Sequence, residues 1–177
     1  MKLVVCALHD VADLARRHSP AGVISLLSAD QPAPEIVGDA ARLVLRFHDV
    51  AEPREGLTAP DAGMVARILE FAAATRAGET LLLHCWMGIS RSPAAAFILA
   101  CAAAPAAPEE QIALALRRAA PAATPNPLLV SLADRQLGRR GRLVAAIAMI
   151  GRGCETARGD PFELDTAVFA DPPRGAA

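Results

Sequence analysis

Short apolar segments alternate with helix-forming segments along the first half of the chain, and this alternation most constrains the fold. Apolar runs of strand length cover residues 2–8, 22–28, 41–49 and 79–85. Helical spacing of apolar residues is found between them, over 10–18 and 61–78. Strands that alternate with helices form a mostly parallel sheet with helices packed on it. We therefore predict an α/β fold with a central, mostly parallel sheet of about four to five strands, flanked by helices.

The second half of the chain is predicted to be helical. One helix extends from about residue 90 to 104, where Pro105 stops it. Three further helices are predicted over 108–120, 126–138 and 142–153. Gly78 is predicted to cap the helix that precedes the fourth strand. The result is an α/β sheet followed by a helical C-terminal part.

Length and composition favour one globular domain. The chain has 177 residues, of which 53% are hydrophobic and 21% charged, so it can bury a sizeable core. No internal repeat or interdomain linker interrupts the pattern. We predict a single domain over residues 1–170 and a loose C-terminal tail over 171–177.

Charge and cysteine usage exclude several kinds of partner. The formal net charge of −1 gives no sign of a nucleic-acid or membrane surface, and the longest apolar stretches, 94–104 and 143–150, are too short to span a bilayer. The four cysteines have wide, irregular spacings that match neither a zinc site nor a disulfide framework; they are Cys6, Cys85, Cys101 and Cys154. This pattern predicts a reduced, cytoplasmic protein without a metal. It leaves the oligomeric state open.

The segment HCWMGISRS, residues 84–92, joins the fourth predicted strand to the next helix. Ligands of α/β sheets bind at this position, where a strand ends and a helix begins. Gly88 permits a tight turn, so that backbone N–H groups can converge on an anion at the helix start. Arg91 adds a planar fork for two oxygens of a phosphate. The predicted phosphate-binding loop consists of Trp86, Met87, Gly88, Ile89, Ser90 and Arg91.

Cys85 stands at the strand end that faces this loop. The positive field of the loop favours a thiolate, which can attack phosphorus and form a cysteinyl-phosphate. A single cysteine after a strand is more often a small buried hydrophobe, and a single arginine at a helix start is usually solvated. Their occurrence together with Gly88 and Ser92 favours chemistry. His84, taken alone, is more often a structural histidine, and we place it behind the site.

The same segment resembles the HCxxGxxRS signature of cysteine-based protein tyrosine phosphatases, and the short chain is similar to their dual-specificity branch. Nearly the whole chain also resembles a group of bacterial proteins predicted to be tyrosine phosphatases. The resemblance implies that Cys85 is the nucleophile, that Arg91 clamps the phosphate, and that Ser92 assists departure of the sulfur. It implies that His84 orders the loop and helps to keep the thiolate. No metal or organic cofactor is implied.

An alkoxide leaving group needs a proton, which an acid on another loop must supply. The acidic residues ahead of the motif are Asp49, Glu52, Glu55 and Asp61. Similar phosphatases place their acid at the end of the strand before the intervening helix, which favours Asp49. Asp61 follows a proline at a helix start and is explained by capping. Glu52 and Glu55 have the character of solvated loop charges.

Asn126 lies in the segment TPNPLLVSLADRQLG, which resembles the Pro-Asn segment that follows the core of dual-specificity phosphatases. The resemblance implies that Asn126 braces the catalytic loops. A plain helix cap explains the local sequence equally well. Both interpretations remain open at this point.

The sequence therefore predicts a phosphomonoester hydrolase of the protein tyrosine or dual-specificity phosphatase type. Its substrate would be a phosphorylated protein or a small phosphomonoester. The predicted loop has no lysine, which disfavours phosphoinositides. The alternatives are a rhodanese-like sulfurtransferase, whose cysteine carries a sulfane sulfur, and a non-catalytic phosphate-binding module.

Overall fold

A mixed five-stranded sheet forms the centre of the part of the chain that the computed structural model describes, residues 1–36 and 38–170. The predicted tail at 171–177 lies outside the described residues. The strands are β1 (Lys2–Ala7), β2 (Gly22–Leu27), β3 (Ala41–Arg46), β4 (Thr80–Cys85) and β5 (Phe162–Asp165). Their order is β3-β2-β4-β1-β5, in which β5 alone runs antiparallel to its neighbour. The predicted mostly parallel α/β sheet is confirmed.

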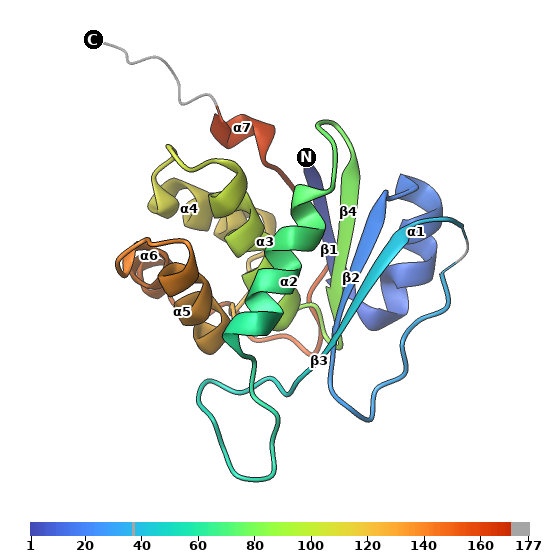
Figure 1. The fold of residues 1–177 in the computed structure, drawn as a ribbon, viewed down its shortest axis with the longest axis horizontal. Helices are drawn as coiled ribbons and strands as arrows, with labels where there is room; N and C mark the ends of the chain where they lie inside the picture. The colour runs from blue at the N-terminus through green and yellow to red at the C-terminus, as the bar shows by residue number, and fades with distance from the viewer. Residues whose placement is uncertain (37, 171–177) are drawn as a thin grey trace.

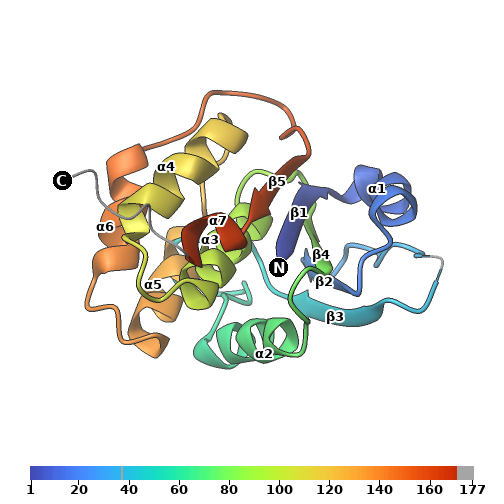
Figure 2. The same cartoon turned by 90° about the horizontal axis from the view of Figure 1, so that it is seen from above.

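Helices cover both faces of this sheet. They are the 3-10 helix η1 (Leu8–Asp10) and the α-helices α1 (Val11–His18), α2 (Ala62–Ala73), α3 (Arg91–Ala103), α4 (Glu109–Ala119), α5 (Pro127–Gln136), α6 (Arg142–Ile150) and α7 (Ala167–Ala170). Figures 1 and 2 show α1 on one face and α2 to α6 on the other. Two groups of buried side chains match these two faces. The predicted helical C-terminal part is confirmed.

The apolar run before Cys85 forms a central strand, β4, that is buried on both faces. Leu83 and Cys85 belong to the core under α2 to α6, whereas Leu82 belongs to the core under α1. In the neighbouring strand β1, Cys6 also lies in the core under α1. Because successive side chains of a strand point to opposite faces, Cys6 and Cys85 project to opposite sides of the sheet.

Strand β3 is an edge strand and shows the alternation that the sequence predicts. Leu43 and Leu45 are buried, whereas Arg42 and Arg46 are exposed. The predicted strand over 41–49 is too long, because the chain leaves the sheet after Arg46. His48 makes two hydrogen bonds with Thr58, its N–H donating to the Thr58 carbonyl at 2.7 Å and its Nδ1 accepting from the Thr58 N–H at 2.9 Å. The loop from 48 to 58 is thereby closed at its base.

Helix α3 is enclosed on all sides, since every residue from Arg91 to Cys101 is buried. It contacts β1, β4 and β5 on one side and α2, α4 and α5 on the others. Alanine at positions 94, 95, 96 and 100 allows this close approach. The N-terminus of α3 directly follows the loop that contains Gly88.

Two predicted helix ends also need correction. Helix α2 ends at Ala73, and Gly78, with a φ of +86°, lies in the turn before β4 instead of capping the helix. Glu79 closes that turn by accepting a hydrogen bond from the Arg76 N–H at 2.7 Å. Helix α6 ends at Ile150, because Gly151 adopts a positive φ of +64°.

Strand β5 and helix α7 were not predicted. β5 has only four residues, so its alternation of Phe162 and Leu164 with acidic residues is too short to be a distinctive signal. It pairs with β1 in the register Val5↔Phe162 and Leu3↔Leu164. Both ends of the described chain therefore meet in the same sheet.

The carboxyl ends of the four parallel strands lie together at one end of the sheet. Ala7 pairs with Cys85 at the ends of β1 and β4, and Leu27 pairs with Arg46 at the ends of β2 and β3. In Figure 1 this is the lower end of the sheet, from which the loop after β3 projects. Among the helices of the described residues, none has the length and apolar character needed to cross a membrane.

We expect Phe162→Ala to destabilise the protein by about 3 kcal/mol, because it removes the buried aromatic side chain by which β5 packs into the core. Urea denaturation measures the change. Glu163→Ala is the matched control: its half-exposed carboxylate pairs with Lys2 at 2.8 Å and lies 3.6 Å from Nε2 of His18, and surface contacts of this kind cost below about 1 kcal/mol. Equal costs for the two variants would show that β5 is not part of the stable sheet.

Candidate active site

The loop of residues 86–90, between the end of β4 and the start of α3, lies directly against the end of β1. Gly88 makes this approach possible. Its φ is +70°, and a Cβ atom at this position would lie 2.9 Å from the backbone nitrogen of Ala7 and 3.0 Å from the carbonyl carbon of Cys6. Any side chain would collide with the backbone and strain the turn. Glycine is therefore required here on two counts.

The carbonyl groups of this loop are held from outside. They accept backbone hydrogen bonds in four places: Trp86 from Leu8 at 3.2 Å, Met87 from Gly159 at 3.0 Å, Ile89 from Thr124 at 2.8 Å, and Ser90 from Asn126 at 3.3 Å. In a trans peptide the N–H points away from the carbonyl of the same unit, so the amides are turned toward the interior of the loop. Within the described part of the chain, the amides of 86–90 donate to no acceptor. Such a ring of free amides at a helix start is suited to bind an anion.

Cys85 lies at the base of this ring and is 2% exposed. The Ser92 hydroxyl donates a hydrogen bond to its sulfur over 3.2 Å. A hydroxyl in this position stabilises negative charge on the sulfur. Elsewhere, burial raises the pKa of the Cys6 and Cys101 thiols, and the nearby carboxylates of Asp10 and Glu109 act in the same direction. Those two cysteines are therefore kept as inert thiols.

The Arg91 guanidinium is buried beside the loop and is held along one edge. Its Nη1 donates to the Phe47 carbonyl at 3.1 Å and to the Ser28 hydroxyl at 3.2 Å. The Phe47 ring lies under the guanidinium, 6.0 Å from ring centroid to carbon. The buried Nε makes no hydrogen bond within the described residues. A cation fixed in this way keeps donors available for a bound anion.

Ser28 was not predicted as part of the site. It directly follows β2, and its backbone is held by three hydrogen bonds: the carbonyl accepts from Arg46 at 2.9 Å and from the Gln31 N–H at 3.2 Å, and the N–H donates to the Gln31 side chain at 2.9 Å. Ser28 acts through Arg91 and is a positioning residue. The available signal was a hydroxyl at the carboxyl end of a predicted strand, which is a common feature and identifies no partner.

Asp49 contacts the loop from the opposite side. Its Oδ1 accepts hydrogen bonds from the Ser90 hydroxyl at 2.7 Å and from the Asn126 side-chain amide at 2.8 Å. Its Oδ2 lies 3.9 Å from Nε of Arg91. The carboxylate is thus tied through one oxygen and faces the guanidinium with the other.

Asn126 makes hydrogen bonds both to α5 and to the loop that carries Asp49. Its Oδ1 accepts from the Leu129 N–H at 2.8 Å and caps α5. Its Nδ2 donates to Asp49 and also to the Val50 carbonyl at 3.0 Å. One buried amide therefore joins the start of α5 to the loop that carries Asp49.

The other acidic candidates lie away from the loop of residues 86–90. Asp61 caps α2 by accepting from the Met64 N–H at 2.8 Å. Glu52 is exposed and pairs with Arg54 at 3.5 Å, and Glu55 is exposed as well. Of the four carboxylates, Asp49 is the one that contacts Ser90 of the loop and faces Arg91.

His84 lies behind the loop, on the α1 face of the sheet. It is fully buried, and its Nε2 is 2.6 Å from the hydroxyl of Ser25 on β2. Burial lowers the pKa of His84 to about 4; the Arg91 charge acts in the same direction, and the Cys85 backbone opposes both. The imidazole is therefore neutral at physiological pH. It ties β4 to β2 just before the loop begins.

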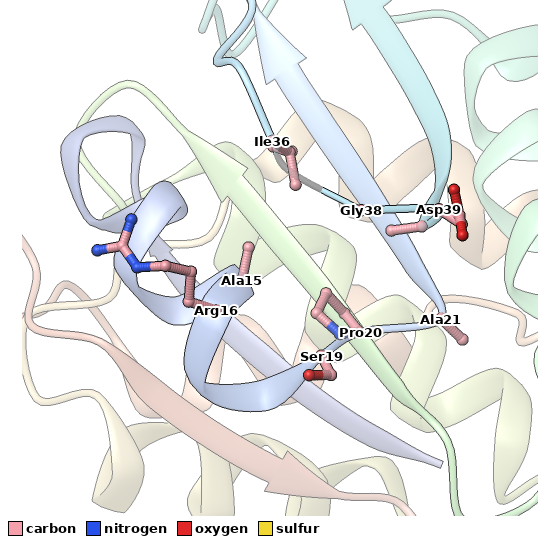
Figure 3. A pocket seen from close by; sticks show the side chains of 9 residues that line it. Ala15, Arg16, Ser19, Pro20, Ala21, Ile36, Gly38 and Asp39 are labelled. Carbon is pink, nitrogen blue, oxygen red and sulfur yellow. The ribbon is translucent and has the colours of Figure 1, made fainter.

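A cavity of about 400 Å³ opens at the amino end of the parallel strands, near the end of α1 and the start of β2. Figure 3 shows its lining, in which the Arg16 guanidinium points away from Asp39. None of the predicted site residues lies there. In the described residues, no group of three histidine, cysteine or acidic side chains is placed to hold a metal ion.

Comparison with known proteins shows that the fold of this chain is similar to that of several solved structures. No family model matches the chain, and no curated protein does. Several solved structures are similar. DUSP15 has a TM-score of 0.62 at 20% identity, over 84% of this chain and 89% of that chain. Human DUSP28 has a TM-score of 0.60 at 20% identity, over 78% and 92%. PTPMT1, in complex with PI(5)P, has a TM-score of 0.58 at 16% identity, over 78% and 94%.

The low pKa of His84 predicts a pH-dependent stability. The unfolded histidine takes up a proton below its ordinary pKa of 6.5, while the folded one stays neutral down to about pH 4. Stability is therefore complete above about pH 6.5 and falls as the pH drops toward 4. Between about pH 7 and pH 5 the loss from this residue is about 2 kcal/mol.

The measurement is urea denaturation of the wild type and of His84→Gln across this pH range. Glutamine keeps a hydrogen-bonding group near Ser25 but cannot titrate, so the variant should lose this part of the pH dependence. Parallel curves for the two proteins would contradict a neutral, buried His84.

Proposed function

We propose that this chain, which has the dual-specificity phosphatase fold of the cysteine-based protein tyrosine phosphatase superfamily, hydrolyses phosphomonoesters through a cysteinyl-phosphate. The observation that carries the proposal is the ring of unpaired amides over Cys85, with the donors of Arg91 beside it. This arrangement matches the three equatorial oxygens of a phosphoryl group in transfer. A nucleophile lies at its base.

In the first step the Cys85 thiolate attacks phosphorus. The S–P bond forms as the bond from phosphorus to the leaving oxygen breaks. Asp49 gives its proton to that oxygen, so the product leaves as a neutral alcohol or phenol. We assign this proton to Oδ2, because Oδ1 already accepts two hydrogen bonds. The loop amides and Arg91 hold the phosphoryl oxygens throughout.

In the second step water attacks the phosphorus of the cysteinyl-phosphate. Asp49, now a carboxylate, accepts a proton from the water as the S–P bond breaks. Cys85 leaves as a thiolate, and the Ser92 hydroxyl, 3.2 Å from the sulfur, stabilises the charge that returns to it. Inorganic phosphate is released, and Asp49 is protonated for the next cycle.

The proposed substrate is a phosphorylated protein, as expected for a phosphatase of the tyrosine or dual-specificity type. The predicted phosphate-binding loop, residues 86–91, contains no lysine, and Arg91 is its one cation, which suits a single phosphate group. The four cysteines are free, which supports a reducing, cytoplasmic location. The pairing of β5 with β1 supports a single phosphatase-like domain over residues 1–170.

Cys85→Ser should lower turnover of p-nitrophenyl phosphate by roughly 10⁴-fold or more, because serine lacks the nucleophilic thiolate. Rapid quenching of the wild type followed by mass spectrometry should find one phosphate on Cys85. Cys154→Ser, at the exposed cysteine, is the control and should keep full turnover. Substantial activity in Cys85→Ser would refute the covalent mechanism. Thiosulfate–cyanide sulfur transfer without phosphatase activity would support the rhodanese-like alternative.

Asp49→Asn should slow hydrolysis of aryl phosphates with basic phenols by roughly 10²–10⁴-fold, since their leaving oxygens need a proton. Asparagine can keep the hydrogen bonds from Ser90 and Asn126, so the loop remains in place. An activated substrate such as p-nitrophenyl phosphate should suffer less. The measurement is log kcat against leaving-group pKa for both proteins. Asp61→Asn, at the α2 cap, is the control; equal slopes for wild type and Asp49→Asn would remove Asp49 from the acid role.

A further inference from the structure

A second cavity, of about 330 Å³, opens directly beside the phosphate-binding loop and has no part in the proposed chemistry. Its lining consists of Ala7, Leu8, His9, Trp86, Met87 and Arg158. Trp86 is the residue after the nucleophile, and 45% of it is exposed. The cavity wall is apolar apart from His9 and Arg158. An exposed indole next to a reactive cysteine provides a binding surface for an apolar group.

The walls of this cavity are fixed to the loop by backbone contacts. The Leu8 N–H donates to the Trp86 carbonyl at 3.2 Å, and the Gly159 N–H donates to the Met87 carbonyl at 3.0 Å. A Cβ atom on Gly159 would lie 2.8 Å from the carbonyl oxygen of Gly88, so the segment that carries Arg158 is packed against the loop. The position of the cavity relative to Cys85 is therefore set by the fold.

Arg158 gives the cavity a positive charge. It is exposed, its guanidinium contacts the His9 ring, and it lies within ion-pair distance of no carboxylate in the described residues. His9 in turn has its Nδ1 3.1 Å from the Asp10 carboxylate, so this carboxylate contacts the imidazole and not the guanidinium. An unpaired guanidinium beside an apolar cavity attracts a carboxylate.

We propose that this cavity is a peptide subsite that gives the enzyme a preference for acidic phosphopeptides with a bulky apolar residue near the phosphorylated one. This rests on the phosphatase function proposed above. In an extended peptide, residues two apart point to the same side. The apolar side chain that enters the cavity is therefore the one two residues from the phosphoresidue. The residues next to that side chain point away from the cavity, and the long, exposed side chain of Arg158 reaches from the cavity wall to bind their carboxylates.

The test compares kcat/KM for phosphotyrosine peptides that carry Leu two residues from the phosphotyrosine, with Asp on both sides of that Leu. One set places this segment before the phosphotyrosine and a second set places it after. In each set Leu is exchanged for Ser, and Asp for Lys. For the set that matches the binding direction, we expect Leu to be favoured over Ser about tenfold and Asp over Lys about fivefold.

Arg158→Glu should reverse the preference between Asp and Lys and leave the preference for Leu over Ser intact. Arg67→Glu is the matched control: this exposed arginine on α2 gives the same change in net charge, and it should leave all preferences unchanged. Arg158→Gln, a milder change, should abolish the charge preference without reversing it, which covers the case in which Arg158→Glu is poorly folded.

Turnover of p-nitrophenyl phosphate separates failure of this proposal from failure of the function on which it rests. The small substrate does not reach a peptide subsite, so Arg158→Glu should hydrolyse it at the wild-type rate. A wild type that turns over p-nitrophenyl phosphate and all peptides of both sets equally well would overturn the subsite. A charge preference that persists in Arg158→Gln would overturn the role of Arg158. A wild type without any phosphatase turnover would overturn the proposed function itself.

Discussion

The site depends on one close approach of backbone to backbone, where Gly88 rests on the end of β1. Any other residue would place a Cβ atom only 2.9 Å from the nitrogen of Ala7, so only glycine lets the loop come this near. This approach lets Leu8 bind the carbonyl of Trp86 from outside, and Thr124 binds that of Ile89 in the same way. With its carbonyls held outward, the loop must turn its amides inward. An arrangement suited to an anion is therefore built from peptide geometry, and a single arginine completes it.

Polar side chains from three distant parts of the chain hold the remaining groups in place. Asp49 follows β3, Ser90 precedes α3, and Asn126 caps α5, yet all three meet at one carboxylate oxygen. These hydrogen bonds hold the Ser90 hydroxyl and the buried Asn126 amide at a carboxylate that is itself exposed to solvent. Their common effect is to leave the second oxygen of Asp49 directed at Arg91, 3.9 Å away. Stability and the proposed proton transfer thus rest on the same contacts.

The C-terminal part of the chain serves the sheet and the site together. Phe162 and Leu164 extend the sheet at β1, while Gly159, a few residues earlier, is packed on Gly88. Because β5 anchors the segment from 151 to 161 at one end, Arg158 is kept beside Trp86. A short strand with little signal of its own therefore determines what lies beside the proposed nucleophile on this side.

The sequence alone determined the parts of this protein that depend on local pattern. Apolar runs and helical spacing predicted the four parallel strands and helices α1 to α6, and the order of Cys85, Gly88, Arg91 and Ser92 predicted the loop and the chemistry proposed for it. Tertiary structure decided what depends on contacts between distant segments. Examples are the hydrogen bond from Asn126 to Asp49, the hydrogen bond from Arg91 to Ser28, and the pairing of the short antiparallel strand β5 with β1. A hydroxyl, an amide or a four-residue strand is compatible with many environments, so only the fold decides which partner each one meets.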